Sequence, residues 1–457
     1  MKRILMAVFV LAAMRVDSRA QENQVQSDFR REIQDFQTDC SAGGLKAVFD
    51  CAKDAFTEQP VHISVGTIAP EDGFGAGPSF VESRDTANWR LSLNSDAVVS
   101  TNASWRAGVY LKAVFTKQKG ITIVTNPNQA NGLSLVREYP VINLYAQGIS
   151  LNALDFYGIG PATQRSAEAI FGMTETIAGA NVLYPLIPRL HISLFGELNG
   201  RFVSIRNGGI AGQGLSELYN NTTAPGLAEQ PGFLQAGEGV RFQPTMLNNH
   251  VQPDLALTYQ QFEAPGSKYS FQRLNTNVGV TVPLYHSMIV KTRTYNGPDE
   301  CGAGVHDRKC PVVMDRTGSV GLRLLITQSM TPAGNSVPFY FQPTIGGGDL
   351  NNQNVLPAYA DYRFRAPNLI VVRATFEHSI WGPLGFQFLY DIGKVAATRS
   401  DIDFNHLAHS FGAGLTLRAG GMPEVSFLFA FGGGEGTHTL LLMNNSLLGG
   451  SARPSLF

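Results

Sequence analysis

The sequence predicts an all-β protein, a transmembrane antiparallel β-barrel of about 16 strands with a short N-terminal helical segment. Three observations support this prediction. The chain of 457 residues begins with an export signal, and most of it alternates between polar and apolar residues. The connections between the alternating segments are also alternately short and long. Alternation with a period of two indicates strands that have one polar face and one apolar face.

Residues 1–20 have the layout of a secretory signal peptide. Lys2 and Arg3 form a basic start, residues 4–14 are apolar but too few to span a bilayer, and small residues precede a cleavage position that we place after Ala20. An exported chain reaches an oxidising compartment, where disulfides form and persist. We therefore expect the mature protein outside the cytoplasm.

The composition favours a membrane protein in which polar and apolar residues are finely mixed. Hydrophobic residues make up 44% of the chain, whereas charged residues make up 16%, and about a quarter is usual for soluble proteins. Beyond the signal there is no run of about 18 apolar residues, so we expect no membrane-spanning helix. A net charge of −1 gives no indication of nucleic-acid binding.

Residues 21–60 are predicted to form a short periplasmic helical segment, because apolar residues such as Phe29, Ile33 and Phe36 recur at helical spacing. Whether this segment lies at the periplasmic mouth of the barrel or enters the lumen stays open.

The four cysteines are candidates for two local disulfides, one joining Cys40 to Cys51 and one joining Cys301 to Cys310. Other pairings are possible, and a metal site that includes His306 is the rival interpretation. Mass spectrometry of unreduced peptides would distinguish these alternatives.

Residues 61–457 are predicted to form the barrel. Leu198 and Phe202, for example, are apolar where Asn199 and Arg201 are polar. Segments of about 10 to 14 residues suit tilted membrane strands better than the shorter strands of most soluble proteins. Lipid offers no partner to an unpaired strand edge, so the sheet must close. The alternation is clearest in residues 104–115, 189–203, 274–284 and 386–392.

The connections between these segments predict one rim with tight turns and one rim with long loops, as in outer-membrane barrels. The expected short turns are residues 248–250, 285–286, 379–383 and 420–421. The expected long loops are residues 117–132, 204–236, 297–317, 345–367 and 396–408.

Several short motifs resemble those of the bacterial surface antigen superfamily, the group of BamA and TamA. The sequence FYGIGP at 156–161 resembles an early barrel signature of that family. Further motifs follow in the family's order: VPFY at 337–340, IGGG at 345–348, LPAY at 356–359, YRFR at 362–365 and IWGPLG at 380–385. The resemblance covers roughly residues 150–445.

In that family the loop that corresponds to residues 345–367 folds into the lumen. The resemblance therefore implies an inward loop, held to the barrel wall by an arginine, with Glu377 and Asp391 on the following strands as possible lumen partners. This chain departs from the motif at Pro357 and Ala358, where the family has Arg and Gly. The residues that match the motif are Tyr359, Arg363, Phe364 and Arg365.

The resemblance also implies a function at the bacterial outer membrane, namely assisting the insertion or translocation of protein or lipid. The implied partners are outer-membrane lipids, lipopolysaccharide and unfolded outer-membrane protein clients. The short stretch before the first strands is similar to a branch of the family without periplasmic POTRA domains. The alternative is a passive, porin-like diffusion or uptake channel with a loop-constricted lumen.

No pattern indicates an enzyme, and we predict no catalytic, cofactor-binding or metal site. Residues 317–321 lack the first glycine of a Gly-x-Ser-x-Gly nucleophile motif. The glycines of residues 73–77 lie on an alternating strand and are not expected to form a nucleotide loop. His406, His409 and Ser410 are close in sequence, but they fit ordinary loop residues better than a lipase triad.

Overall fold

The computed structural model describes residues 60–117, 121–124, 135–208, 212–244, 246–247, 250–294, 309–351, 353–381, 384–419 and 422–443. Residues 1–59 lie outside this set, and with them the predicted signal peptide, nearly all of the predicted helical segment, Cys40 and Cys51. Cys301 also lies outside it, and the side chain of Cys310 is not described. The disulfides and the helical segment therefore stay predictions.

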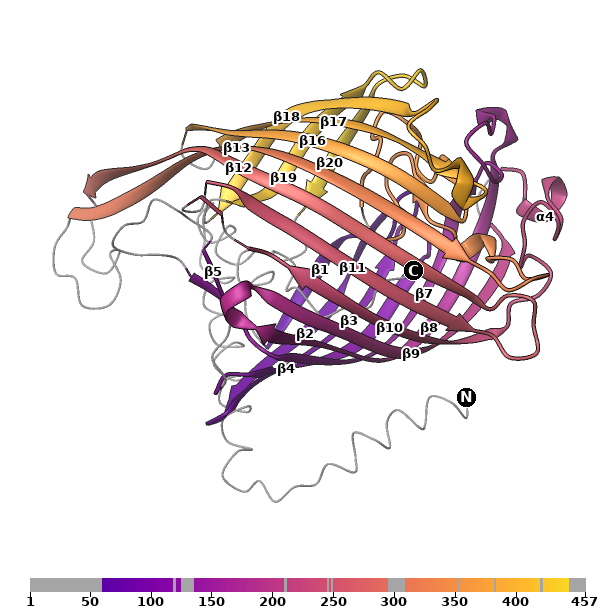
Figure 1. Cartoon of the computed structure of the whole chain (residues 1–457), viewed down its shortest axis with the longest axis horizontal. Coiled ribbons are helices and arrows are strands. Elements are labelled where there is room, and N and C mark those ends of the chain that lie inside the picture. The colour runs from indigo at the N-terminus through magenta and orange to yellow at the C-terminus, as the bar shows by residue number, and fades with distance from the viewer. Residues whose placement is uncertain are drawn as a thin grey trace, which may run out of the picture.

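Sixteen strands form one antiparallel sheet in which each strand pairs with its neighbours along the chain. Figure 1 shows that this sheet curls round into a barrel. The strands are β1 (Val61–Thr67), β2 (Phe74–Asp85), β3 (Trp89–Ser100), β4 (Trp105–Phe115), β7 (Val141–Phe156), β8 (Ala169–Ile187), β9 (Ile192–Asn207), β10 (Gly232–Phe242), β11 (Gln252–Glu263), β12 (Phe271–Thr294), β13 (Lys309–Met330), β16 (Asn368–Trp381), β17 (Leu384–Ala396), β18 (Ala408–Ala419), β19 (Met422–Phe431) and β20 (His438–Met443). The all-β class and the strand number predicted from the sequence are thus confirmed.

The remaining elements are short. Two small hairpins stand apart from the main sheet, and the described helices have only three or four residues. None of the described helices is long and apolar enough to cross a membrane. These elements are β5 (Ile121–Val124) with β6 (Leu135–Glu138), β14 (Thr344–Ile345) with β15 (Phe364–Arg365), α4 (Leu215–Leu218), and the 3-10 turns η1 (Arg165–Ala167), η2 (Pro188–Leu190), η3 (Phe339–Phe341) and η4 (Arg399–Asp401).

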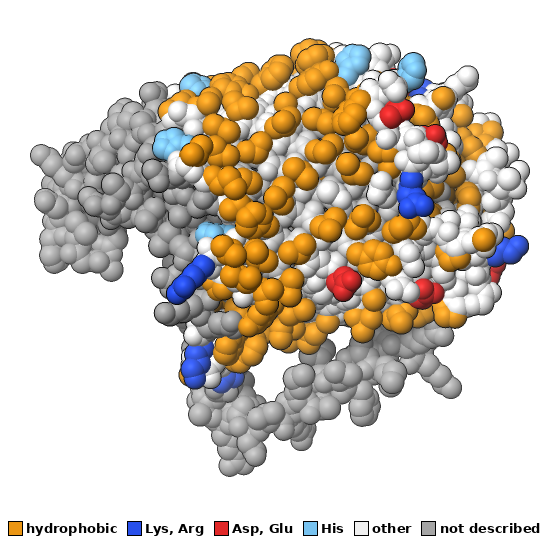
Figure 2. Space-filling view, in the orientation of Figure 1, with side chains coloured by type: hydrophobic (Ala, Val, Ile, Leu, Met, Phe, Trp, Pro, Cys, Tyr) orange, Lys and Arg blue, Asp and Glu red, His pale blue; other side chains and the backbone are white. Residues whose placement is uncertain are grey.

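The alternation seen in the sequence sorts side chains between the two faces of the wall. On β9, Leu198 and Phe202 are 55% and 66% exposed, whereas Asn199 and Arg201 are 2% and 1% exposed. Figure 2 shows hydrophobic side chains spread over the visible outer face of the strands. An apolar surface this extensive is rare on proteins in water and is typical of a barrel in contact with lipid.

The connections lie at two rims. We call the rim with residues 86–88 and 188–191 the turn rim, and the rim with residues 157–168 and 331–367 the loop rim. Figure 1 places α4 at the loop rim, and β5 with the protruding ends of β12 and β13 at the opposite rim.

The predicted turn at residues 285–286 is wrong. β12 passes through this point and pairs with β13 as far as Thr294 opposite Lys309, with one irregularity between Pro283 and Tyr285. A bulge accommodates the proline without ending the strand, so the local turn signal was misleading. The predicted long loops at 117–132 and 297–317 lie partly outside the described residues, and their described parts include strands, since residues 121–124 pair with β6 and residues 309–317 belong to β13.

Candidate functional site

The connection between β13 and β16, residues 331–367, folds into the barrel, and we call it the inward loop. Every residue from 337 to 350 is buried, and so are residues 356–359 and 362–366. β14 and β15 pair within it, with Thr344 opposite Arg365 and Ile345 opposite Phe364. The inward loop is therefore a folded plug at the loop rim and not a solvated excursion.

Aromatic rings fix the first half of the inward loop to the wall. The ring of Phe339 packs edge-on against Phe156 and Phe171, each with centroids 5.2 Å apart. The ring of Phe341 packs edge-on against Phe233 at 5.0 Å. Such pairs contribute about 0.5–1.5 kcal/mol each beyond the burial of their area, so this cluster is a large part of what holds the loop inside.

Arg365 joins three of the motifs that the sequence analysis singled out. Its fully buried Nη1 donates a hydrogen bond to the Phe339 carbonyl oxygen at 2.8 Å. Its own carbonyl oxygen accepts the Gly160 N–H at 2.8 Å. Gly160 has a φ of +117°, which non-glycine residues rarely adopt. The glycine of the FYGIG motif thus allows its backbone to bond with the RFR segment.

Arg363 ties the inward loop to two other loops of the loop rim. Its Nε donates to Glu435 Oε1 at 2.5 Å, and its Nη1 and Nη2 donate to Thr163 Oγ1 and the Thr163 carbonyl oxygen at 2.8 and 2.7 Å. The side chains of Arg363 and Glu435 are 5% and 13% exposed, so solvent screens the pair weakly. The guanidinium also lies over the Tyr157 ring, 5.0 Å from its centroid.

Asp391 and Arg373 form a second anchor below the loop. Arg373 donates through Nε and Nη2 to the two carboxylate oxygens of Asp391 at 2.7 and 2.6 Å. Asp391 Oδ2 also accepts the Leu356 N–H at 2.9 Å, and Arg373 Nη2 donates to the Asn354 carbonyl oxygen. The wall pair therefore holds the tip of the inward loop through its backbone.

Neither Arg363 nor Arg365 pairs with Glu377 or Asp391, the partners expected from the sequence. Asp391 does contact the inward loop, but its cationic partner is Arg373. Glu377 lies opposite Gln387 near the turn-rim end of β16, whereas the inward loop enters from the other end of that strand. Alternation predicted which face Glu377 occupies, but it carries no information on depth along the barrel.

The remaining motif positions are also placed. Tyr359 is buried, and its ring packs edge-on against Phe364 with centroids 5.2 Å apart. Ala358, which stands where the family motif has Gly, donates its N–H to Ser410 Oγ at 2.9 Å. Although Pro357 and Ala358 depart from the family motif, this part of the loop is still hydrogen-bonded to β18.

Sequence reasoning missed Glu435, the carboxylate that Arg363 binds. Glu435 lies in the turn between β19 and β20, within the segment GGGEG. Gly432, Gly434 and Gly436 there have φ values of +96°, +77° and +112°, so this turn depends on glycine. A lone acid among glycines in a turn was the only available signal.

The inward loop also contacts the first hairpin of the sheet. The Tyr362 hydroxyl donates to the Pro70 carbonyl oxygen at 3.3 Å, in the turn between β1 and β2. In the same turn, Asp72 Oδ1 accepts the N–H groups of Asn152 and Ala153 at 2.8 and 3.1 Å. The inward loop therefore touches the hairpins at both ends of the strand order, through Pro70 and through Glu435.

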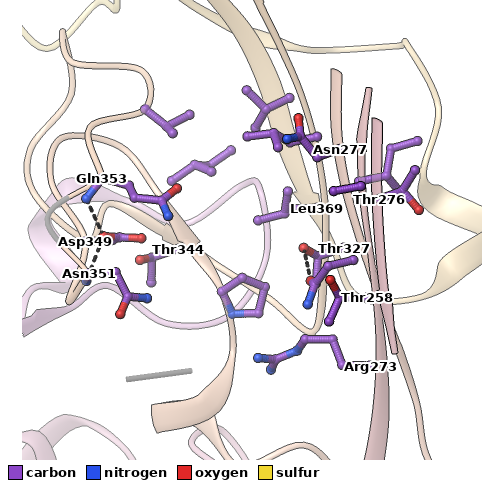
Figure 3. A pocket seen from close by; sticks show the side chains of 18 residues that line it. Thr258, Arg273, Thr276, Asn277, Thr327, Thr344, Asp349, Asn351, Gln353 and Leu369 are labelled. Atoms are coloured by element: carbon purple, nitrogen blue, oxygen red, sulfur yellow. Dashed lines mark hydrogen bonds between the residues drawn. The ribbon is translucent and has the colours of Figure 1, made fainter. Parts of the chain in front are cut away.

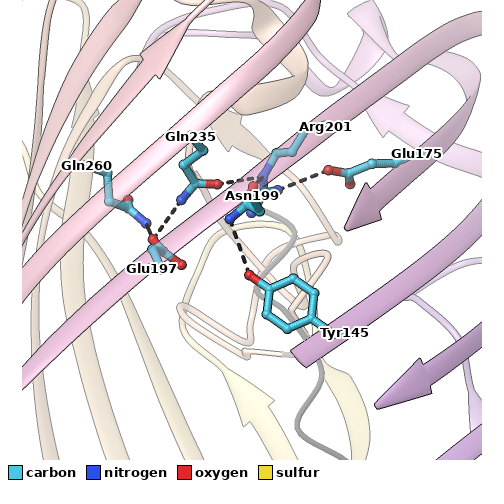
Figure 4. Close-up of polar contacts among 7 residues, drawn as sticks. All are labelled: Tyr145, Glu175, Glu197, Asn199, Arg201, Gln235 and Gln260. Atoms are coloured by element: carbon cyan, nitrogen blue, oxygen red, sulfur yellow. Dashed lines mark hydrogen bonds and ion pairs between the residues drawn. The ribbon is translucent and has the colours of Figure 1, made fainter. Parts of the chain in front are cut away.

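Farther down the lumen, a polar network covers the inner wall from β7 to β11 (Figure 4). Its centre is the ion pair of Arg201 Nη1 with Glu175 Oε1, 3.0 Å apart and with both side chains 1% exposed. Gln235 bridges Arg201 to Glu197, with hydrogen bonds of 2.6 and 2.7 Å. Hydrogen bonds of this kind offset the cost of burying polar groups, although Glu175 Oε2 has no partner among the described residues.

Burial shifts two carboxyl groups of the inward loop toward the protonated form. It raises the pKa of Asp349 to about 7 and that of Asp361, which faces Glu71, to about 6. A carboxyl group whose pKa is higher in the folded state stabilises that state fully at low pH, and the contribution is lost as the pH rises through about 6 to 7. We expect the inward loop to be docked more firmly at pH 5.5 than at pH 8.5.

Limited proteolysis of the inward loop tests this expectation. Cleavage should be at least about tenfold slower at pH 5.5 than at pH 8.5, because a carboxyl group with a pKa of about 7 alone contributes more than one pKa unit over this range, after correction with an unfolded peptide that contains the same site. Asp349→Asn and Asp361→Asn keep the oxygens that accept the Gln353 and Gly348 N–H groups and should flatten the dependence. If the double variant showed the same pH dependence of cleavage as the wild type, groups other than Asp349 and Asp361 would be responsible for it.

The fold and the site together define an outer-membrane type of antiparallel barrel with a folded inward loop. No protein-family model matches the sequence, and no curated protein matches it. Among solved structures, the chain is similar to BamA from Haemophilus ducreyi lacking POTRA domains 1-3, with 13% identity, a TM-score of 0.47, and coverage of 84% of this chain and 70% of that one.

Two CdiB structures are also similar. CdiB from Acinetobacter baumannii shares 11% identity, with a TM-score of 0.44 over 81% of this chain and 55% of that one. CdiB from Escherichia coli shares 12% identity, with a TM-score of 0.45 over 85% and 62%. The chain thus spans little more than half the length of the CdiB chains.

Proposed function

We propose that this protein works in the bacterial outer membrane and assists the insertion or translocation of protein or lipid there, at the seam between β1 and β20. The observation that carries this proposal is the position of the inward loop. It is folded inside the barrel and contacts both hairpins that flank the seam. A lumen occupied in this way suits a wall-based activity better than an open pore.

The dimensions of the terminal strands support the same proposal. In the described part of the chain, β1 has seven residues and β20 has six, whereas β8 has 19 and β12 has 24. With seven residues, β1 can form fewer inter-strand hydrogen bonds across the seam than a long interior pair such as β8 with β9. Extended client segments can add to a strand edge through backbone hydrogen bonds. The proposed partners are therefore unfolded outer-membrane proteins, with lipids and lipopolysaccharide around the seam.

Depletion of the protein tests this function. We expect the folded forms of other outer-membrane barrels, or the lipid distribution between the leaflets, to change, and a plasmid copy to restore them. A porin-like channel gives a different result: uptake of small solutes falls while the outer-membrane proteome and the lipids stay unchanged. That second result would overturn the proposal.

Localisation is tested separately. The mature protein should fractionate with the outer membrane, and its mobility in a denaturing gel should change on boiling, because a closed barrel resists detergent when cold. Recovery of the protein in the soluble fraction would contradict both the location and the barrel.

A further inference from the structure

A cavity of about 240 Å³ separates the inward loop from the wall strands β11, β12, β13 and β16 (Figure 3). More than half of its lining residues are polar or charged, and the others are apolar. At roughly 30 Å³ for each water molecule, it is large enough for a small organic molecule. Among the lining residues are Arg273, Thr344, Ile345, Leu369 and Val371.

Arg273 is the unusual member of this lining. Its side chain comes from β12, it is 2% exposed, and Figure 3 shows its guanidinium directed toward the inward loop. Nη2 donates to the Phe341 carbonyl oxygen, but Nε has no hydrogen-bond partner in the described part of the chain. The rings of Phe262 and Phe271 lie 5.5 and 5.3 Å from the guanidinium carbon.

No carboxylate pairs with Arg273 among the residues that the structure describes. The other fully buried arginine of the wall network, Arg201, has Glu175 at 3.0 Å. Glu197, on the same inner wall, accepts hydrogen bonds from Gln235 and Gln260. A buried cation without a counter-charge is unfavourable, so this position is incomplete as protein alone.

Asp349 is the only acidic residue in the cavity lining, and it does not supply the missing charge. Its Oδ1 accepts the N–H groups of Asn351 and Gln353 at 2.9 and 2.7 Å, so it stabilises the turn of the inward loop. Across the cavity, the Thr344 hydroxyl is buried and has no partner in the described chain. Arg273 and Thr344 thus both line the cavity, and Arg273 Nε and Thr344 Oγ1 have no hydrogen-bond acceptor among the described residues.

We propose that this cavity binds a small organic anion, a carboxylate with a short apolar body, whose oxygens accept hydrogen bonds from Arg273 and Thr344. The apolar body would lie against Ile345, Leu369 and Val371. The anion completes the charge balance of the wall and links the wall to the inward loop. This site goes beyond the proposed function, and its failure would leave the depletion result unaffected.

Equilibrium dialysis of the full chain in detergent micelles with radiolabelled butyrate tests the proposal at constant ionic strength. We expect saturable binding that Arg273→Met weakens about tenfold or more. Thr344→Val, which preserves shape and keeps the protein testable if the arginine variant does not fold, should weaken binding about threefold. Arg323→Met is the matched control, because Arg323 is half-exposed on the same wall and lies 3.7 Å from Asp254; it should bind as wild type does.

Competition with unlabelled solutes identifies the chemistry. Acetate and butyrate should displace the label, with butyrate the stronger competitor, and glycerol should not. If inorganic phosphate competed as well as butyrate, the proposed role of the ligand's apolar body would be overturned. Absence of saturable binding, or equal binding by wild type and both site variants, would overturn the site itself.

Discussion

Replacement of Asp391 by alanine is expected to release the tip of the inward loop and to lower the free energy of unfolding by about 1.5–3 kcal/mol, because Asp391 is fully buried while its partner Arg373 is 27% exposed. Asp391 is fully buried, and its two oxygens accept Arg373 Nε and Nη2 and the Leu356 N–H. Its removal leaves the Arg373 charge without a counter-ion and the Leu356 N–H without an acceptor.

Urea unfolding in micelles, followed by the heat-sensitive gel mobility, measures the loss. External protease should then cut the inward loop faster than it does in the wild type at the same pH. Asp254→Ala is the matched control, since Asp254 is 30% exposed and lies 3.7 Å from Arg241 and from Arg323; a pair of this kind contributes about 0–1 kcal/mol. Equal losses in the two variants would show that Asp391 does not anchor the loop.

Substitutions that remove the ion pair between Arg363 and Glu435 are expected to free the inward loop from the last hairpin, while the barrel still assembles. A hydrogen-bonded charged pair contributes about 1.5–3 kcal/mol, and here both side chains are largely buried. Arg363→Ala and Glu435→Gln should each raise single-channel conductance and antibiotic sensitivity. The double variant should do little more than Arg363→Ala alone, because the two residues act through one contact.

Arg365→Ala serves as the comparison for the second prediction. The Arg365 side chain donates to Phe339 inside the inward loop and makes no contact with the last hairpin in the described structure. This variant should loosen the fold of the loop itself, so its effect should add to that of Glu435→Gln. If Arg363→Ala and Glu435→Gln both conduct as wild type does, the Arg363–Glu435 pair is not the connection that closes the loop rim.

The sequence alone determined the class of fold because each strand records its own environment. A residue on a wall strand faces either lipid or lumen, so a period of two appears wherever a strand crosses, as in Leu198 and Phe202 against Asn199 and Arg201. The export signal and the absence of long apolar runs then left a barrel as the prediction. The order of short motifs also pointed to an inward loop between β13 and β16.

Only the tertiary structure decided which groups meet inside the barrel. Arg363 is 72 residues from Glu435 and 200 residues from Thr163 in the chain. A local sequence pattern cannot predict contacts between residues so far apart. Depth along the barrel depends on the register of all the intervening strands, which is why Glu377 was expected near the loop and lies toward the turn rim. The bulge at Pro283 shows the same limit, because the residues that end a strand in one context bend it in another, and the pairing partner decides between them.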